Sequence, residues 1–358
     1  MKKLILFELR KIVSKRLTLI VLIGILLFSV LLFCSTYQNK YAFDEKIGEG
    51  SGKTAVEIDK EIAAKFEGIL TDEKVQQMMS DFAPTFDLHG LNAAYVYQNA
   101  TQSAAFARFS DQNGNWNGLR VSDVFGDKEI KIGYVDGWLS TSRNLVRTFV
   151  ALALAVIIMI APVFSGEYEG MDNLILTSKY GKTKCAAAKV IAGILTAVLT
   201  TALVAAFHLL LALGLYGTEG LDCSILFAPS DYVEAFILFN ITCGTLLKYQ
   251  ILLAFTCTLS VTGMTLFLSA ISKNQIVSLV AAMASFLFPV LLPITEGNPL
   301  FRLVGLLPIY HVLAVSLLSV EQMSNGMLYA IWAIPAALLF LGAGAGISRR
   351  AFAKHQIS

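Results

Sequence analysis

Long apolar runs, separated by shorter polar stretches, dominate this chain. A helix needs about 20 predominantly apolar residues to cross the hydrocarbon core of a bilayer. Six runs reach that length, and they predict six membrane-spanning helices at residues 17–36, 146–164, 190–216, 250–271, 275–294 and 327–347. We therefore expect an α-helical polytopic membrane protein.

Two further apolar runs are interrupted by polar residues. The run at 233–247 contains Glu234, and the run at 300–318 contains Arg302 and Pro308. If only one of them crossed the membrane, the basic C-terminal tail would lie on the opposite side from the N-terminus. If both runs crossed, the C-terminal tail would again lie on the same side as the N-terminus, and the charge pattern does not exclude this arrangement. We interpret both runs as interfacial or re-entrant segments.

The charge distribution gives the orientation of the spans. Of the 358 residues, 56% are hydrophobic, as expected for a membrane protein. With six spans and a cytoplasmic N-terminus, the inner segments hold fourteen Lys and Arg against four acidic residues, and the short outer loops hold two against six. This follows the positive-inside rule, so both termini are expected in the cytoplasm. The polar segments are then an external domain at 37–145, an inner loop at 165–189, outer loops at 217–249 and 295–326, and a tail at 348–358.

Residues 1–16 are predicted to form an amphipathic helix. One face, at helical spacing, comprises Leu4, Ile5, Glu8, Leu9, Ile12 and Val13, with Lys and Arg between them. Such a helix suits the surface of the inner leaflet. A basic flank that only sets the topology is the alternative interpretation.

The external domain at 37–145 is more polar than the rest of the chain. Apolar residues recur at helical spacing between residues 56 and 82, and residues 111–118 are rich in Gly, Asn and Asp. We expect a mixed α/β or mostly α domain there.

Residues 47–54 imitate the phosphate-binding Gly-x-x-x-x-Gly-Lys-Ser/Thr loop. The pattern fails because Ile47 stands where the first glycine belongs, and no apolar strand precedes it. A glycine turn ending in a capping box, Thr54 with Glu57, explains the residues more simply. The chain therefore encodes no ATP-hydrolysing motor.

Other catalytic patterns are missing from the sequence. The four histidines lack metal-ligand spacing, and no nucleophile turn occurs. We predict no catalytic residue, no metal site and no enzyme activity. His208, inside a predicted span, is either a functional group or a neutral imidazole bonded to a neighbouring helix. Cys223 and Cys243 share an outer loop, where they are either a disulfide or two thiols.

Hydroxyl side chains line one face of the span at 250–271. They are Thr258, Thr262, Thr265 and Ser269, at intervals of four, three and four residues. This stripe is a candidate translocation path for cargo. Interhelical contact through small polar residues is the alternative role.

The inner loop at 165–189 carries a long, ordered motif. Its parts are Phe164-Ser-Gly-Glu167, Gly170, Leu174-Ile-Leu176, Lys179-Tyr-Gly-Lys182 and Lys189. This order resembles the inner loop of ABC-2 type transporter permeases, the membrane subunits of ATP-driven bacterial exporters. The basic N-terminal segment and the six spans fit the same family, whereas residues 37–145 are not covered. Lys182 departs from the pattern, because the family usually has Arg there.

The motif offers an apolar knob with charged edges to a partner protein. The predicted ATPase-coupling residues are Glu167, Glu169, Gly170, Leu174, Ile175, Leu176, Lys179 and Lys182. The resemblance implies two copies of a separate ATPase subunit that binds ATP and Mg²⁺, and a second permease, identical or a sister chain. It implies no cofactor in this chain and no nucleic acid as partner. An ordinary inner loop with snorkelling lysines is the alternative.

The resemblance also implies a function and a location. We expect the permease subunit of an exporter in the bacterial cytoplasmic membrane, embedded in lipid, that moves a peptide, an amphipathic drug or a lipid-like cargo. The alternative is a membrane sensor or immunity protein that binds an external peptide through its outer domain without transport. An intramembrane enzyme is a third hypothesis, but no set of catalytic residues supports it.

Overall fold

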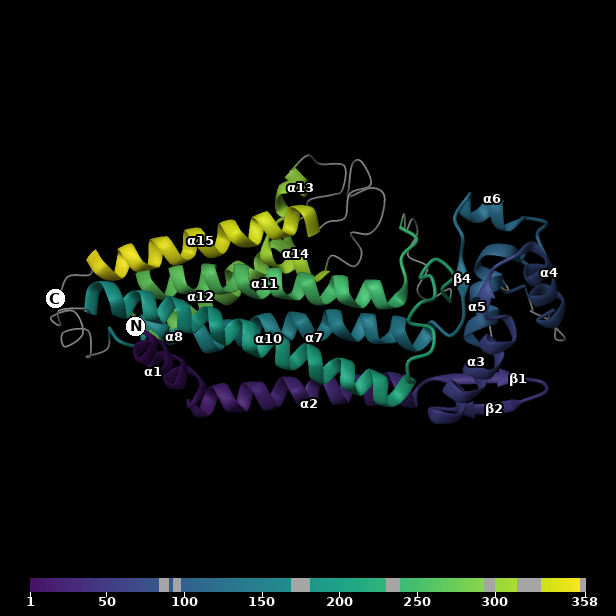
Figure 1. The fold of residues 1–358 in the computed structure, drawn as a ribbon, viewed down its shortest axis with the longest axis horizontal. Helices are drawn as coiled ribbons and strands as arrows, with labels where there is room; N and C mark the ends of the chain where they lie inside the picture. Colours follow the sequence, from purple (N-terminus) through teal and green to yellow (C-terminus); the bar gives the residue numbers. More distant parts are fainter. Residues whose placement is uncertain are drawn as a thin grey trace.

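The computed structural model describes residues 1–83, 90–92, 98–168, 181–229, 239–292, 300–313 and 330–354. Long helices lie side by side along one axis, and a smaller polar domain lies at one end of this bundle (Figure 1). The N-terminus and the end of the last helix lie together at the opposite end (Figure 1). The molecule is therefore elongated along the direction of its long helices.

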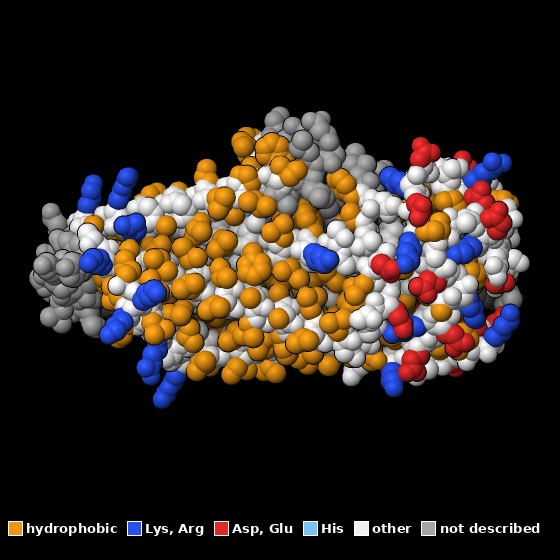
Figure 2. Space-filling model, viewed as in Figure 1, with side chains coloured by type: hydrophobic (Ala, Val, Ile, Leu, Met, Phe, Trp, Pro, Cys, Tyr) orange, Lys and Arg blue, Asp and Glu red, His pale blue; other side chains and the backbone are white. Residues whose placement is uncertain are grey.

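Among the described residues, five helices are long and apolar enough to cross a membrane. They are α2 (Arg16–Gln38), α7 (Asp136–Ile160, continued by α8, Pro162–Ser165), α10 (Ala186–Tyr216), α11 (Cys243–Ile271) and α15 (Ala330–Lys354). Figure 2 shows hydrophobic side chains covering the bundle, Lys and Arg at the end near the termini, and charges of both signs over the polar domain. These observations confirm the prediction of a helical, multi-pass membrane protein.

The predicted span at 275–294 is shorter than expected. Helix α12 (Gln275–Leu287) passes into the 3₁₀ turn η4 (Phe288–Leu291), which carries Pro289. Proline ends the α-helix there, because its ring clashes with the preceding turn and its nitrogen has no hydrogen to donate. This apolar helix falls below the length of the five candidate spans.

Helix α7 begins well before Val146, the predicted start of the second span. The added turns carry polar side chains, including Thr141, Ser142 and Asn144, all of which are buried against neighbouring helices. Asn144 Nδ2, for example, donates to Thr36 Oγ1 on α2 at 3.1 Å. Such residues resemble a loop in a hydropathy pattern although they lie inside the bundle.

The two broken apolar runs contribute short or different elements. The run at 300–318 is described as far as residue 313, and there it forms α13 (Leu300–Val304) and α14 (Pro308–Leu313), of five and six residues. The run at 233–247 lies partly outside the described residues. Its last part, from Cys243, belongs to α11.

Helix α1 (Lys2–Val13) has the predicted amphipathic character, but its apolar face is turned inward. Glu8 and Ile12 are buried, and the helix packs along α10. Leu6, Phe7 and Val13 are exposed apolar residues of this helix, and of these Val13 belongs to the predicted face. The face predicted for the lipid surface therefore serves as a packing face.

The polar domain is built from short helices and two-stranded ribbons. Its described helices are α3 (Lys53–Phe66), α4 (Asp72–Asp81), α5 (Ala100–Phe109) and α6 (Val121–Phe125). Its antiparallel ribbons pair β1 (Tyr41–Asp44) with β2 (Gly48–Ser51), and β3 (Gly68–Ile69) with β4 (Lys131–Ile132). Phe66, Met78, Phe106 and Phe109 are among the residues of a second, separate apolar core.

The residues that imitate a phosphate loop form the end of a hairpin. Gly48–Ser51 is strand β2, and α3 begins at Lys53 with Gly52 in the N-cap position at φ +59°. A positive φ favours glycine. The predicted cap at Thr54 is therefore wrong, because the strand leads directly into the helix.

The loop between α10 and α11 completes the polar domain. Leu226 and Phe227 belong to its core. The Arg108 guanidinium donates to the Ala228 carbonyl at 2.7 Å and lies over the rings of Phe125 and Phe227. Burial lowers the pKa of Arg108 to about 10, which still leaves it charged at neutral pH. The domain is thus assembled from two separate parts of the chain.

Ion pairs join the polar domain to the bundle. Lys40, just after α2, bonds to Asp59 on α3 at 2.7 Å and also to Asp136 at the start of α7. Lys60 pairs with Glu219 at 3.1 Å, and both ammonium groups lie over the ring of Tyr134. The domain is therefore held to three helices rather than tethered by a single linker.

Helices α11 and α15 approach most closely at two glycines. A Cβ atom built on Gly344 would lie 2.0 Å from the Gly263 carbonyl oxygen, whereas one built on Gly342 meets nothing within 4 Å. Of the three glycines at 342, 344 and 346, the middle one therefore makes the contact.

This crossing predicts opposite effects for two matched substitutions. Gly344→Ala forces the two backbones apart and should lower the free energy of unfolding by about 1–3 kcal/mol. Gly342→Ala should leave it unchanged or raise it by up to about 1 kcal/mol, because alanine favours the helix. Thermal unfolding in detergent measures both. Equal stability of the two variants would contradict the crossing.

Candidate functional site

The helix that enters the inner loop is broken at Pro162. Helix α7 ends at Ile160, and Pro162 begins the short helix α8. The Ser165 hydroxyl donates back to the Ala161 carbonyl at 2.8 Å. The break leaves backbone groups near the end of α7 that need partners from elsewhere.

Hydroxyl groups from two other helices supply those partners. Ser269 Oγ on α11 accepts from the backbone N–H groups of Phe164 at 3.0 Å and Ser165 at 3.1 Å, and it donates to the Ala161 carbonyl at 2.5 Å. Ser278 Oγ on α12 donates to the same carbonyl at 3.2 Å. A single buried hydroxyl on α11 therefore fixes where α7 turns into the loop.

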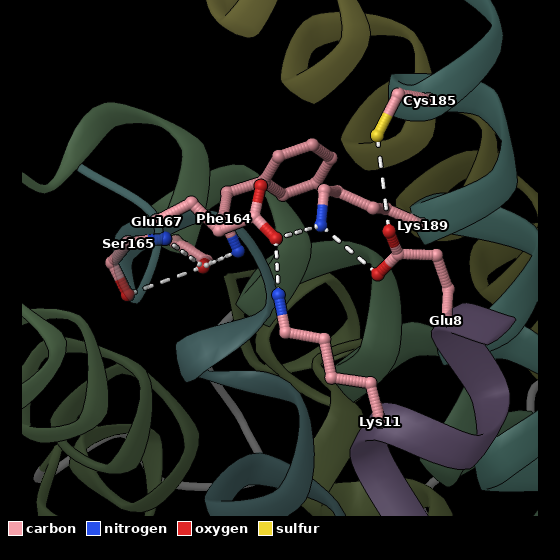
Figure 3. A network of polar contacts seen from close by, with 8 residues as sticks. Glu8, Lys11, Phe164, Ser165, Glu167, Cys185 and Lys189 are labelled. Carbon is pink, nitrogen blue, oxygen red and sulfur yellow. Dashed lines mark hydrogen bonds and ion pairs between the residues drawn. The ribbon is translucent and has the colours of Figure 1, made fainter. Parts of the chain in front are cut away.

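A cluster of four charged side chains lies immediately beyond the break, and we call it the charge cluster. Lys189 Nζ on α10 bonds to Glu8 Oε2 on α1 at 3.0 Å and to Glu167 Oε1 at 2.5 Å. Lys11 Nζ on α1 reaches the same Glu167 oxygen at 2.5 Å. Figure 3 shows Glu8 and Lys11 reaching in from α1, with Glu167 and Lys189 facing them.

Burial makes the charge cluster energetically demanding. The Lys189 side chain is 0% exposed, and those of Glu8 and Glu167 are 7% and 3% exposed. An ammonium group in such surroundings is tolerated only when carboxylates neutralise it. Cys185, one turn before Lys189, adds a weak contact from its thiol to Glu8 at 3.8 Å. Removal of any one charge leaves another uncompensated.

Positive charge is in excess around the two carboxylates. Lys15, at the end of the α1 segment, is partly buried beside the charge cluster. Burial lowers the pKa of its ammonium group, and repulsion from Lys11 and Lys189 lowers it further, while Glu167 and Glu8 act in the opposite direction. This end of the bundle is therefore suited to contact with acidic groups.

Aromatic packing closes the site on the side of α15. The Phe352 ring lies 5.2 Å from the Phe164 ring and stacks on Tyr168 at 6.0 Å. The Tyr168 hydroxyl donates to the Ala270 carbonyl on α11 at 2.9 Å. The start of the loop is thus held by α1, α10, α11 and α15 together.

Most of the predicted coupling residues lie outside the described part of the chain. These are Glu169, Gly170, Leu174, Ile175, Leu176 and Lys179. Lys182 lies in the π-helical turn η2 (Gly181–Cys185), which leads into α10. Glu167 is the predicted coupling residue whose contacts are described.

The hydroxyl stripe of α11 is buried in the bundle. Thr258, Thr262, Thr265 and Ser269 are each at most 1% exposed. Thr258 Oγ1 accepts from Thr201 Oγ1 on α10 at 3.0 Å, and Ser269 binds the break in α7. These two contacts match the interhelical role, and the translocation path stays a prediction.

His208 and the cysteine pair also have defined surroundings. His208 Nδ1 lies 3.2 Å from Ser29 Oγ on α2, and its ring packs on Phe33. Cys223 and Cys243 are free thiols, although the Cys243 N–H donates to the Cys223 carbonyl at 2.9 Å. Burial raises the pKa of Cys223 to about 12, so this thiol stays protonated at neutral pH. A disulfide between them stays a prediction.

Three members of the charge cluster, Glu8, Lys11 and Lys189, are not among the predicted coupling residues. Glu8 was visible as an acidic residue on the apolar face of a basic helix, and Lys189 as the cation that opens a span. These two residues are far apart in the sequence, so no local sequence pattern predicts that they pair. No group of three metal-ligating side chains occurs among the described residues.

The charge cluster predicts a large effect for Lys189→Met. Buried Glu8 would lose its cation and Glu167 one of its two, so the free energy of unfolding should fall by about 3–5 kcal/mol. Lys273→Met, at an exposed position of the same end, is the control and should have no measurable effect. Denaturant titration of both variants in micelles is the measurement, and equal midpoints would rule out the assigned pairing.

The break in α7 predicts a second effect, at Ser269→Ala. The N–H groups of Phe164 and Ser165 would lose their acceptor, which should cost about 1–3 kcal/mol of stability. Ser260→Ala is the matched control, because this buried hydroxyl on the same helix bonds only to a carbonyl of its own turn, that of Thr256. If both variants unfold alike, Ser269 does not hold the break.

Comparison with known protein families, curated protein sequences and solved structures finds no match to this chain. The resemblance of the inner loop to ABC-2 type permeases therefore rests on its motif alone.

Proposed function

We propose that this chain is the permease subunit of an ATP-driven ABC-2 type exporter in the bacterial cytoplasmic membrane. The observation that carries the proposal is the charge cluster, which joins both ends of the inner loop to α1. Glu167 precedes and Lys189 follows residues 169–180, and the two side chains bond to each other and to α1. A force on the loop would therefore act on three helices together.

The break at Pro162 supports the same role. In this short helix the backbone N–H groups of Phe164 and Ser165 bond to Ser269 on α11, so a tilt of α8 against α7 would cost few bonds of the α7 backbone. The long helices beyond it would carry that tilt toward the polar domain (Figure 1). In this proposal the loop receives the push of a separate ATPase and the bundle transmits it.

The membrane topology belongs to the proposal as well. Both termini and the inner loop lie in the cytoplasm, the polar domain lies outside, and α12 with its 3₁₀ turn is a sixth, shorter span. The concentration of Lys and Arg at the end with the termini supports this orientation (Figure 2). The outer domain would then shape the recognition or release of cargo.

The proposed assembly needs partners that this chain does not encode. Two ATPase subunits would bind ATP and Mg²⁺, and a second permease, identical or a sister chain, would complete the translocation path. The cargo class is a peptide, an amphipathic drug or a lipid-like molecule. An adjacent coding sequence with an intact phosphate-binding loop would support the assignment.

The apolar knob predicts a loss of coupling when it is made polar. Replacing Leu174, Ile175 and Leu176 together by Ser should reduce binding of a co-expressed ATPase, and its stimulated ATP hydrolysis, on the order of tenfold or more, because a buried apolar contact would be lost. Leu91→Ser with Leu119→Ser, at exposed sites of the polar domain, is the control. Unchanged binding and hydrolysis in the triple variant would contradict the coupling role.

A pocket in the polar domain favours a second candidate function, a sensor or immunity protein. It has a volume of about 260 Å³ and is lined by residues that include Lys65, Phe66, Asp81, Phe82 and Gln102. Aromatic rings with both charges and an amide suit a peptide. Peptide binding that persists without an ATPase, with no ATP-dependent flux in vesicles, would favour this function over transport.

A further inference from the structure

An open apolar groove lies at the end of the bundle that adjoins the polar domain. Its volume is about 410 Å³, and it runs between the last turns of α10 and the first turns of α11. Its apolar wall comprises Trp138, Leu209, Leu213, Leu221, Leu247 and Ile251. Leu209 lies about 10 Å before the end of α10 at 1.5 Å per residue, so the groove extends into the apolar belt.

One cation lies in the wall of this groove. Lys248 is exposed on the second turn of α11, about 7 Å from the first residue of the helix. Among the described residues it has no ion-pair partner. Asp222, also in the lining, is held by Lys131, and that bond lowers the pKa of the Asp222 carboxyl. The charge of Lys248 is therefore not neutralised by its acidic neighbour.

Hydroxyl groups lie near this cation. Thr242 caps α11 by accepting from the Thr245 backbone N–H at 3.2 Å, and the two threonine hydroxyls lie 2.9 Å apart. The opening thus combines an ammonium group and two hydroxyls, which are good partners for phosphate oxygens. The leucine wall below it suits a hydrocarbon chain.

We propose that this groove binds one anionic phospholipid of the leaflet next to the polar domain, with its phosphate at Lys248 and an acyl chain along Leu209, Leu213 and Ile251. A soluble anion would make no use of the apolar wall, and an uncharged lipid would make no use of the cation. This lipid site requires only that the protein is inserted in a membrane, so a test of it is independent of the proposed transport function.

Trp138 provides a probe inside the groove. A variant with Trp116→Phe and Trp332→Phe keeps Trp138 as its one tryptophan. The full chain is placed in phosphatidylcholine vesicles, and phosphatidylglycerol or phosphatidylcholine brominated on the acyl chain is added in steps. Bromine quenches tryptophan fluorescence only at short range. We expect brominated phosphatidylglycerol to reach half-maximal quenching of Trp138 at a mole fraction at least threefold lower than that needed for brominated phosphatidylcholine.

Substitutions separate a binding site from a snorkelling lysine. Lys248→Gln should abolish the preference for phosphatidylglycerol, and Lys248→Arg should keep it. Leu213→Phe, which fills the groove, should reduce quenching by both lipids. Lys273→Gln and Leu199→Phe are exposed controls away from the groove and should change neither. Equal quenching by the two lipids, or a preference that survives Lys248→Gln, would overturn the proposal.

Discussion

A buried ammonium group needs carboxylates beside it, because the low-dielectric interior of a helical bundle does not solvate an isolated charge. In this chain that group is Lys189, and its two carboxylates come from different parts of the sequence, Glu8 and Glu167. The requirement fixes α1 against α10 and brings the two ends of the inner loop together. Helix α1, whose sequence suits the surface of a membrane, therefore packs against the bundle.

The same end of the bundle carries its main irregularity. Pro162 interrupts the backbone hydrogen bonds of α7, and Ser269 on α11 bonds to the backbone N–H groups that follow the break. The charge cluster therefore lies directly beyond the break in α7. At the far end, ion pairs of Lys40 hold the polar domain to the bundle. The arrangement joins a candidate input site to the polar domain through long helices.

The sequence predicts the long helices well, because an apolar run of bilayer length has few other solutions. It predicts their ends poorly. The first turns of α7 carry Thr141 and Asn144, which look like loop residues, yet both are buried in the bundle, where Asn144 Nδ2 donates to Thr36 on α2. The length of α12 depends on Pro289, and the hydropathy averaged over the apolar run does not reveal where a proline ends the helix.

The candidate site divides in the same way. Glu167 belongs to a local motif and was identified from it. Glu8 and Lys189 are 181 residues apart, and no periodicity or spacing announces that they bond. Ser269 was grouped with a stripe of hydroxyls, whereas its partners are backbone groups of another helix. Long-range polar pairing depends on the tertiary fold, so the charge cluster required the three-dimensional structure.

A double-mutant cycle between Glu8 and Lys189 tests this account most directly. The single variants Glu8→Gln and Lys189→Gln and the double variant are unfolded by denaturant in micelles, and the free energies are compared. Contact in one buried network predicts a coupling energy of about 1–3 kcal/mol. Additive effects, within about 0.5 kcal/mol, would mean that these side chains do not hold α1 on α10.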